Sequence, residues 1–108
     1  MNIDHLISDV ESELTNLFYD KLAKIILYGS YARGDYDDDS DVDIIALIDD
    51  DNLKKYEKEI LMIDVDLSLK YDVDLSIFIE NSDEFALNKS VIPLYKNIAG
   101  EGVNIHAV

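Results

Sequence analysis

The sequence predicts an α+β fold of one domain, with helices and strands in the order α-β-β-α-β-α-α-β. Three observations carry this prediction. The chain has 108 residues, the length of a single domain. Its 48% hydrophobic and 31% charged residues are typical of a globular protein. Its apolar residues alternate between helical spacing and short continuous runs. We expect residues 1–108 to form one domain, since neither a linker nor a low-complexity tract divides them.

The first half of the chain contains one expected helix, two expected strands and the start of a second helix. Apolar residues recur at helical spacing over residues 3–19, which predicts an amphipathic helix. The run AKIILYG ends at Gly29 and predicts the first strand, and DVDIIALI predicts the second. The segment DDDN then predicts a turn and a helix cap. The helix that follows is expected from about Asn52 to about Leu69, because its apolar residues lie three or four apart.

The pentapeptide DVDLS occurs twice, at residues 64–68 and 72–76. The first copy falls within the helical rhythm, whereas the second leads into the β-type run LSIFI, which predicts a third strand at about 73–79. We therefore expect the same five residues to adopt two conformations, with the flanking sequence deciding between them.

The last third of the chain predicts two short helices and an edge strand. Ser82 is the expected cap of a helix at about 83–90. The segment PLYKNIAG has Pro93 at a helix start and Gly100 just past a helix end. The final GVNIHA is expected to form a short edge strand.

Charge and composition exclude several functional classes. The formal net charge is −15, with 24 acidic residues against nine Lys and Arg, too few cations for a nucleic-acid interface. Such an anionic chain favours metal ions, cationic small molecules or a basic protein partner. It has no cysteine, no apolar run long enough to span a bilayer and no signal-peptide pattern at MNIDHLISDV. We expect a cytoplasmic protein without a membrane or nucleic-acid partner.

The segment from Gly29 to Asp43 is the strongest candidate for a site, because it holds six aspartates between Asp35 and Asp43. A solvated surface loop is the usual explanation of such a cluster. That explanation does not account for Asp41 and Asp43, which lie at the entrance of an apolar strand. At a spacing of two residues both carboxylates point to one face of the strand, about 7 Å apart. This arrangement is unfavourable unless a cation compensates it.

Two kinds of cation site contain closely spaced aspartates of this sort. An EF-hand loop needs glycine at its sixth position and glutamate at its twelfth. Counting from Asp35 those places hold serine and alanine, and counting from Asp37 they hold valine and isoleucine, which excludes the EF-hand. A nucleoside-triphosphate site fits better. Gly29 allows backbone amides to approach phosphate closely, Ser30 opens an expected short helix over SYAR, and the two aspartates suit Mg²⁺.

The same residues resemble a known family. Gly29 and Ser30, followed after ten residues by Asp41-Val42-Asp43, match the G-S-x10-D-x-D signature of the DNA polymerase β-like nucleotidyltransferase superfamily. The segments GSYARG and SDVDI, and the ending PLYKNIAGEGVNIHA, are similar to its minimal nucleotidyltransferase (MNT) branch. The resemblance covers nearly the whole chain and implies an α/β sandwich-like fold, with a mixed sheet of three or four strands flanked by helices.

The resemblance also implies a third carboxylate on a later strand. Asp74 fits best, because it precedes the apolar run of the third strand. Asp72 is the rival, and the aspartates of the helical copy at 64–68, Asp64 and Asp66, are weaker ones. Arg33 matches the family's ARG, and we expect it either to contact phosphate or to anchor the loop through Asp35.

The chemistry implied by the resemblance is transfer of a nucleoside monophosphate, with ATP as donor, to an acceptor hydroxyl. Asp41, Asp43 and Asp74 would hold two Mg²⁺ ions, and Gly29 and Ser30 would position the triphosphate. Most of the rate acceleration would then come from positioning the substrates and neutralising the charge of the phosphates.

The acceptor is expected to be another protein, because relatives that act on other acceptors add domains and this chain stops at Val108. MNT proteins of this size resemble antitoxins encoded beside HEPN-domain toxins, which they bind and in characterised cases adenylylate on a tyrosine. The negative charge suits masking of a basic ribonuclease surface. Two other functions remain open: a binding antitoxin with a vestigial site, and an aminoglycoside-type nucleotidyltransferase.

Overall fold

The computed structural model describes residues 2–107, and its elements follow the predicted order with one short helix, α2, inserted after β1. Single 3₁₀ turns follow α1 (Tyr19–Lys21) and precede α3 (Leu53–Tyr56). The helices and strands are α1 (Ile3–Phe18), β1 (Leu22–Tyr28), α2 (Ser30–Arg33), β2 (Val42–Ile48), α3 (Glu57–Tyr71), β3 (Leu75–Asn81), α4 (Ser82–Asn88), α5 (Pro93–Glu101) and β4 (Val103–Ala107).

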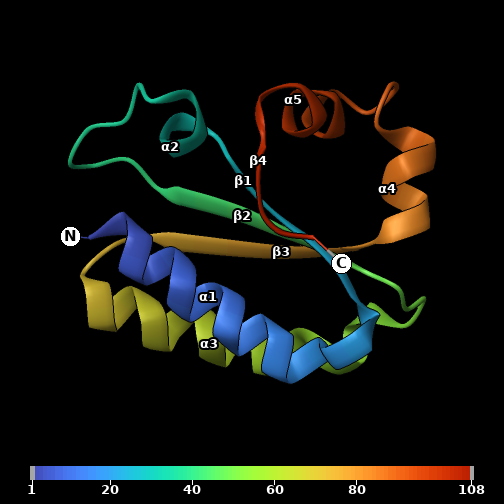
Figure 1. Ribbon diagram of the computed structural model, residues 1–108, viewed down its shortest axis with the longest axis horizontal. Coiled ribbons are helices and arrows are strands. Elements are labelled where there is room, and N and C mark those ends of the chain that lie inside the picture. The colour runs from blue at the N-terminus through green and yellow to red at the C-terminus, as the bar shows by residue number, and fades with distance from the viewer. Residues whose placement is uncertain (1, 108) are drawn as a thin grey trace.

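The four strands form one mixed sheet in the order β3-β2-β1-β4, which confirms the expected fold class. β1 pairs antiparallel with both β2 and β4, whereas β2 and β3 are parallel. The parallel pair requires a crossover, and α3 supplies it along one face of the sheet (Figure 1). GVNIHA forms the edge strand β4, as predicted.

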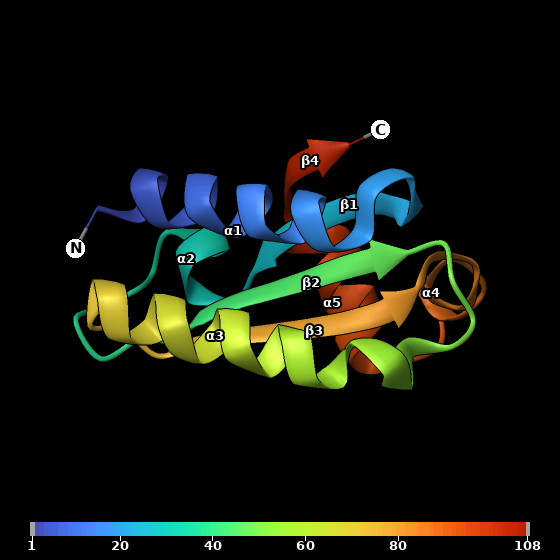
Figure 2. The same cartoon turned by 90° about the horizontal axis from the view of Figure 1, so that it is seen from below.

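The helices form two layers around the sheet. α1 and α3 cover one face, α4 and α5 cover the other, and α2 lies at the end of the sheet beside the end of β1 (Figures 1 and 2). Alternate residues of β1 and β2 therefore enter two separate apolar clusters, as the period of a strand requires. On β2, Ile44 and Ala46 pack beneath α1 and α3, whereas Ile45 and Leu47 pack against α4 and α5. No helix of residues 2–107 has the length and apolar content needed to cross a bilayer.

The two DVDLS copies adopt different conformations, as expected, and they contact each other. The first lies in α3, where Asp64 Oδ2 accepts a hydrogen bond from the Ile77 amide at 3.2 Å. Ser68 Oγ accepts one from the Leu75 amide at 3.3 Å. β3 is an edge strand, and these side chains bind amides that β2 does not use. The first copy thus holds the start of the strand to which the second copy leads.

Several boundaries and two caps differ from prediction. α3 begins at Glu57 after a 3₁₀ turn rather than at about Asn52, and α5 runs through Gly100 to Glu101, with Gly102 as its C-cap. The third strand begins at Leu75 rather than 73, because Asp72 ends α3 in the left-handed conformation (φ 51°) and the Val73 amide bonds back to Ser68 O. Ser82 is not the cap of α4: β3 continues to Asn81, whose side chain accepts from the Glu84 amide at 2.9 Å. The predicted DDDN cap is also absent, since Asn52 makes no side-chain cap bond at the turn before α3.

We predict that Asp64→Ala lowers the free energy of unfolding by about 1–2 kcal/mol, because the Ile77 amide loses its acceptor at a partly buried position. Asp66→Ala, in the same pentapeptide but exposed, serves as the matched control and should change stability by less than about 0.5 kcal/mol. Urea unfolding of the two variants measures the difference. Equal stabilities would show that Asp64 does not support β3.

Candidate active site

The predicted site residues gather at one end of the sheet. β1 runs into this end and finishes at Tyr28, opposite Asp43, while β2 and β3 both start there. The Val42 amide donates to Asp74 O at 2.8 Å, so Asp74 lies at the start of the strand beside β2. Gly29 comes directly after β1. Strand pairing therefore brings Asp74 beside the segment from Gly29 to Asp43, which lies about 30 residues earlier in the chain.

Asp43 points to the sheet face opposite α1 and α3. Its neighbours Val42 and Ile44 are buried beneath those helices, so the strand alternation turns Asp43 the other way, onto the face of Tyr28. Asp41 and Asp74 each precede a strand by one residue, and the pleat puts them in step with Asp43. The backbone register thus places Asp74 on the same face of the sheet as Asp43.

The charges of this cluster are not balanced within the protein. Burial raises the pKa of Asp43, and the neighbouring Asp41 carboxylate raises that pKa further, while Arg33 lowers it only in part. Burial and the Asp43 charge together raise the pKa of Tyr28 to about 12. An uncompensated pair of carboxylates is the condition under which a bound cation stabilises a site.

Within residues 2–107 no three His, Cys, Asp or Glu side chains lie close enough to hold a metal ion by themselves. Asp41 and Asp43 are coupled through their charges, whereas Asp74 is exposed and does not affect the pKa of Asp43. The expected convergence of three carboxylates is thus not assembled in the structure. Mg²⁺ usually takes one or two carboxylates together with phosphate oxygens and water, so the Asp41–Asp43 pair fits a metal carried in with a triphosphate.

Gly29 meets two requirements that only glycine satisfies. Its backbone has φ 77° and ψ −156°, a region that other residues rarely adopt. A Cβ at this position would lie 2.5 Å from Asp43 Oδ2. The Gly29 carbonyl also accepts from the amides of Ala32 and Arg33, both at 3.1 Å, and so begins the short helix predicted over SYAR. The glycine thus packs directly against the Asp43 carboxylate.

Arg33 anchors the loop, one of the two roles expected for it. Its Nε donates to Asp35 at 3.1 Å and its Nη1 to Glu101 at 3.0 Å, which ties α2 to the end of α5. The Arg33 side chain is 44% exposed, and its positive charge lowers the pKa of Asp43. Sequence reasoning missed Glu101 and Tyr28: the first lies 68 residues from its partner, and the second resembles an ordinary core residue.

The acidic loop contains carboxylates with structural roles as well as the candidate ligands. Asp37 accepts from the Asp39 amide at 2.9 Å and from Ser40 Oγ at 3.3 Å, and Tyr36 stacks on Tyr31 with ring centroids 4.3 Å apart. The surface-loop explanation is therefore adequate for this part of the segment. That explanation does not account for Asp41 and Asp43 at the start of β2.

The rivals of Asp74 lie elsewhere. Asp72 is exposed and caps α3 in the left-handed conformation, outside the strand. Asp64 faces the open edge of β3, and Asp66 is exposed and lines a groove between α1 and α3. Of these candidates only Asp74 begins the strand beside Asp41 and Asp43.

The sequence of this chain matches that of known proteins. Residues 7–99, most of the chain, match the family described as nucleotidyltransferase domain. The chain belongs to this family. The nucleotidyltransferase is 41% identical over 76 residues to a candidate protein adenylyltransferase of Methanocaldococcus jannaschii, a match that covers 70% of this chain and 77% of the relative. A second candidate protein adenylyltransferase of that organism is 33% identical over 103 residues, covering 94% and 96% of the two chains.

Solved structures share the fold of this nucleotidyltransferase. A toxin–antitoxin crystal structure with AMP-PNP superposes with a TM-score of 0.63 at 22% identity, covering 94% of this chain and 73% of the other. A complex of a tri-AMPylated Shewanella oneidensis HEPN toxin with its MNT antitoxin gives 0.59 at 20% identity, covering 97% and 72%. At these identities the likeness establishes the fold.

Proposed function

We propose that residues 1–108 act in the cytoplasm as a single minimal domain that transfers AMP from ATP to a hydroxyl, expected to be a tyrosine, of a HEPN-type toxin, and so serve as the antitoxin of the pair. The observation that carries the proposal is the Asp41–Asp43 pair directly beside Gly29, whose charges Arg33 compensates only in part. Membership of the nucleotidyltransferase family supports the chemistry. The relatives and the toxin–antitoxin neighbours support the acceptor class.

In this proposal Asp41 and Asp43 hold Mg²⁺ together with phosphate oxygens, and Asp74 joins them by turning its exposed side chain toward the site. When bound by these aspartates, Mg²⁺ would supply the positive charge that neutralises the phosphates and the attacking and leaving oxygens. The acceptor oxygen bonds to the α-phosphorus as the bond to pyrophosphate breaks. Asp74 accepts the hydroxyl proton. Gly29, Ser30 and Arg33 orient the triphosphate.

A second candidate is an antitoxin that only binds its partner. The absence of a preassembled three-carboxylate cluster in residues 2–107 favours it. It gives no reason for the steric fit between Gly29 and Asp43, because a binding surface does not need a half-buried carboxylate against a glycine. The enzymatic proposal explains that fit.

The test is incubation of the protein with α-labelled ATP, Mg²⁺ and the toxin encoded beside it. We expect label on the toxin, dependent on Mg²⁺ and lost with EDTA. GTP and CTP in parallel reactions report the preferred base. Stable toxin binding without transfer of any label would favour the binding antitoxin, and label on an added aminoglycoside alone would indicate a small-molecule enzyme.

Ser30→Ala is predicted to weaken transition-state stabilisation by about 1–3 kcal/mol, the value of one hydrogen bond to a charged phosphate. Ser82→Ala is the matched control, since Ser82 is also the first residue of a helix and does not cap it. The measurement is kcat/KM for ATP. Equal values for the two variants would place the phosphates away from Ser30.

A further inference from the structure

The helix α3 has an apolar outer face in addition to the face that it buries. Ile60 and Leu67 lie in the core beneath the sheet. On the outside, Leu61, Val65 and Leu69 follow one another at intervals of four residues and so form one stripe. The stripe and the adjacent Met62 are exposed, at 63% for Leu61, 55% for Met62, 46% for Val65 and 77% for Leu69.

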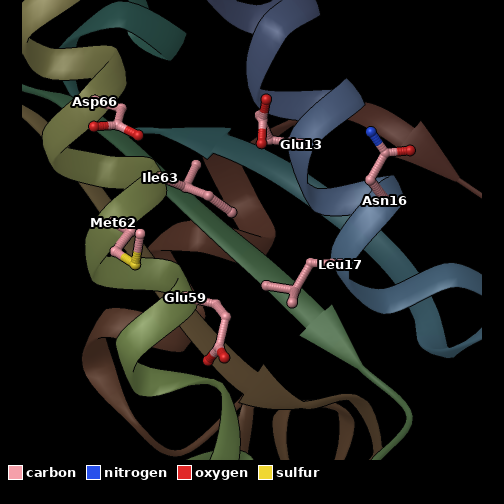
Figure 3. Close-up of a pocket in the computed structure, with 7 residues that line it drawn as sticks. All are labelled: Glu13, Asn16, Leu17, Glu59, Met62, Ile63 and Asp66. Atoms are coloured by element: carbon pink, nitrogen blue, oxygen red, sulfur yellow. The ribbon is translucent and has the colours of Figure 1, made fainter.

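A groove of about 330 Å³ between α1 and α3 adjoins this stripe through Met62 (Figure 3). Its floor is apolar: Leu17 of α1 and Ile63 of α3 point toward each other across it. Its other side chains include three carboxylates and no lysine or arginine; the carboxylates are those of Glu13, Glu59 and Asp66.

The three carboxylates have no partner among the ion pairs of residues 2–107. A groove with an apolar floor and three unpaired carboxylates in its lining is complementary to apolar side chains flanked by positive ones. A second copy of this chain lacks that complementarity, because each copy carries a net charge of −15. Charge therefore selects a basic protein segment over self-association.

We infer that the α1–α3 face, defined as the groove with the outer stripe of α3, docks an amphipathic segment of another protein whose apolar residues are flanked by Lys or Arg. The face lies across the sheet from Asp43, because α1 and α3 cover the opposite side (Figure 2). Docking there leaves the nucleotide site open. The inference does not depend on the proposed transfer reaction.

The experiment uses three synthetic peptides of about 15 residues, the length of α3. The first is a helical peptide with a leucine stripe flanked by lysines, the second has the same composition in scrambled order, and the third replaces lysine by glutamate. We expect calorimetry to show binding of the first peptide at least about tenfold tighter than that of either other. Equal binding of the scrambled peptide would reduce the effect to general charge attraction and overturn the inference. Equal binding of the glutamate peptide would overturn its charge requirement.

Matched pairs of variants on α3 and α4 locate the surface. Met62→Gln with Val65→Gln should weaken binding of the leucine–lysine peptide about tenfold, while Leu87→Gln, at an even more exposed apolar residue of α4 (74%), should leave it unchanged. For the rim, Glu13→Gln with Asp66→Asn should weaken binding several-fold more than Asp83→Asn with Glu84→Gln on α4. Loss of binding only in the α4 variants would overturn the placement. A dimer in sedimentation that Val65→Gln dissociates would instead make a second copy the occupant.

Discussion

Asp43→Asn is expected to reduce nucleotidyl transfer by on the order of 10³-fold or more, without disrupting the fold. The asparagine keeps the size of the side chain and its place against Gly29. It removes the negative charge that would hold Mg²⁺, so the phosphates lose their charge compensation in the transition state. Label transfer from ATP to the toxin measures the loss.

Stability should change in the opposite direction to activity. The pKa of Asp43 is raised in the fold, so its ionised form opposes folding at neutral pH. This penalty is absent below the unfolded pKa of about 3.9 and grows as the pH rises through the raised folded value. Without metal, Asp43→Asn should therefore raise Tm at pH 7 by up to about 4 °C, and the gain should vanish at acidic pH.

Asp38→Asn is the control for Asp43→Asn, because Asp38 is an exposed aspartate of the same acidic loop. Its transfer rate should remain within about threefold of wild type, since it removes the same charge away from the strand entrance. Equal losses in the two variants would mean that the loop acts only through its total charge. A fully active Asp43→Asn would remove this carboxylate from the site.

Gly29→Ala is expected to reduce transfer by on the order of 10²-fold and to destabilise the fold by about 1–3 kcal/mol. Two effects combine in this variant. The backbone is strained, since φ 77° with ψ −156° is a glycine conformation. The new methyl also meets Asp43 Oδ2 at 2.5 Å, so the carboxylate must move.

Gly34→Ala separates these effects. Gly34 also has positive φ, 85°, but a Cβ there would meet nothing within 4 Å. The variant should lose about 1 kcal/mol of stability from backbone strain and retain its transfer activity. If Gly29→Ala behaves like Gly34→Ala in both assays, the contact between Gly29 and Asp43 has no catalytic consequence.

The order of helices and strands could be predicted because it depends on apolar spacing within each segment. The short helix over SYAR and the edge strand GVNIHA also followed from local signals. Exact ends depended on tertiary contacts. Asn81 rather than Ser82 caps α4, because β3 extends to Asn81 and its side-chain amide also bonds Asp50 O at 3.0 Å. Nothing local distinguishes these two capping residues.

The part of the candidate site that lies between Gly29 and Asp43 could also be predicted from local sequence. Gly29, Ser30, Asp41 and Asp43 lie within one short stretch, and the strand period determines how the carboxylates point. The Arg33–Glu101 pair could not be foreseen, since it depends on where α5 returns to the sheet. The repeat of DVDLS was visible, but its use in holding β3 requires knowing that α3 lies along that edge.

The most direct test of the account is mass spectrometry of the toxin after co-expression with the wild-type protein or with Asp43→Asn at equal levels. The account predicts toxin carrying the mass of AMP, on tyrosine, only with wild type, and growth rescue only in that culture. Full rescue by Asp43→Asn, with unmodified toxin in both cultures, would contradict it and leave binding alone as the function.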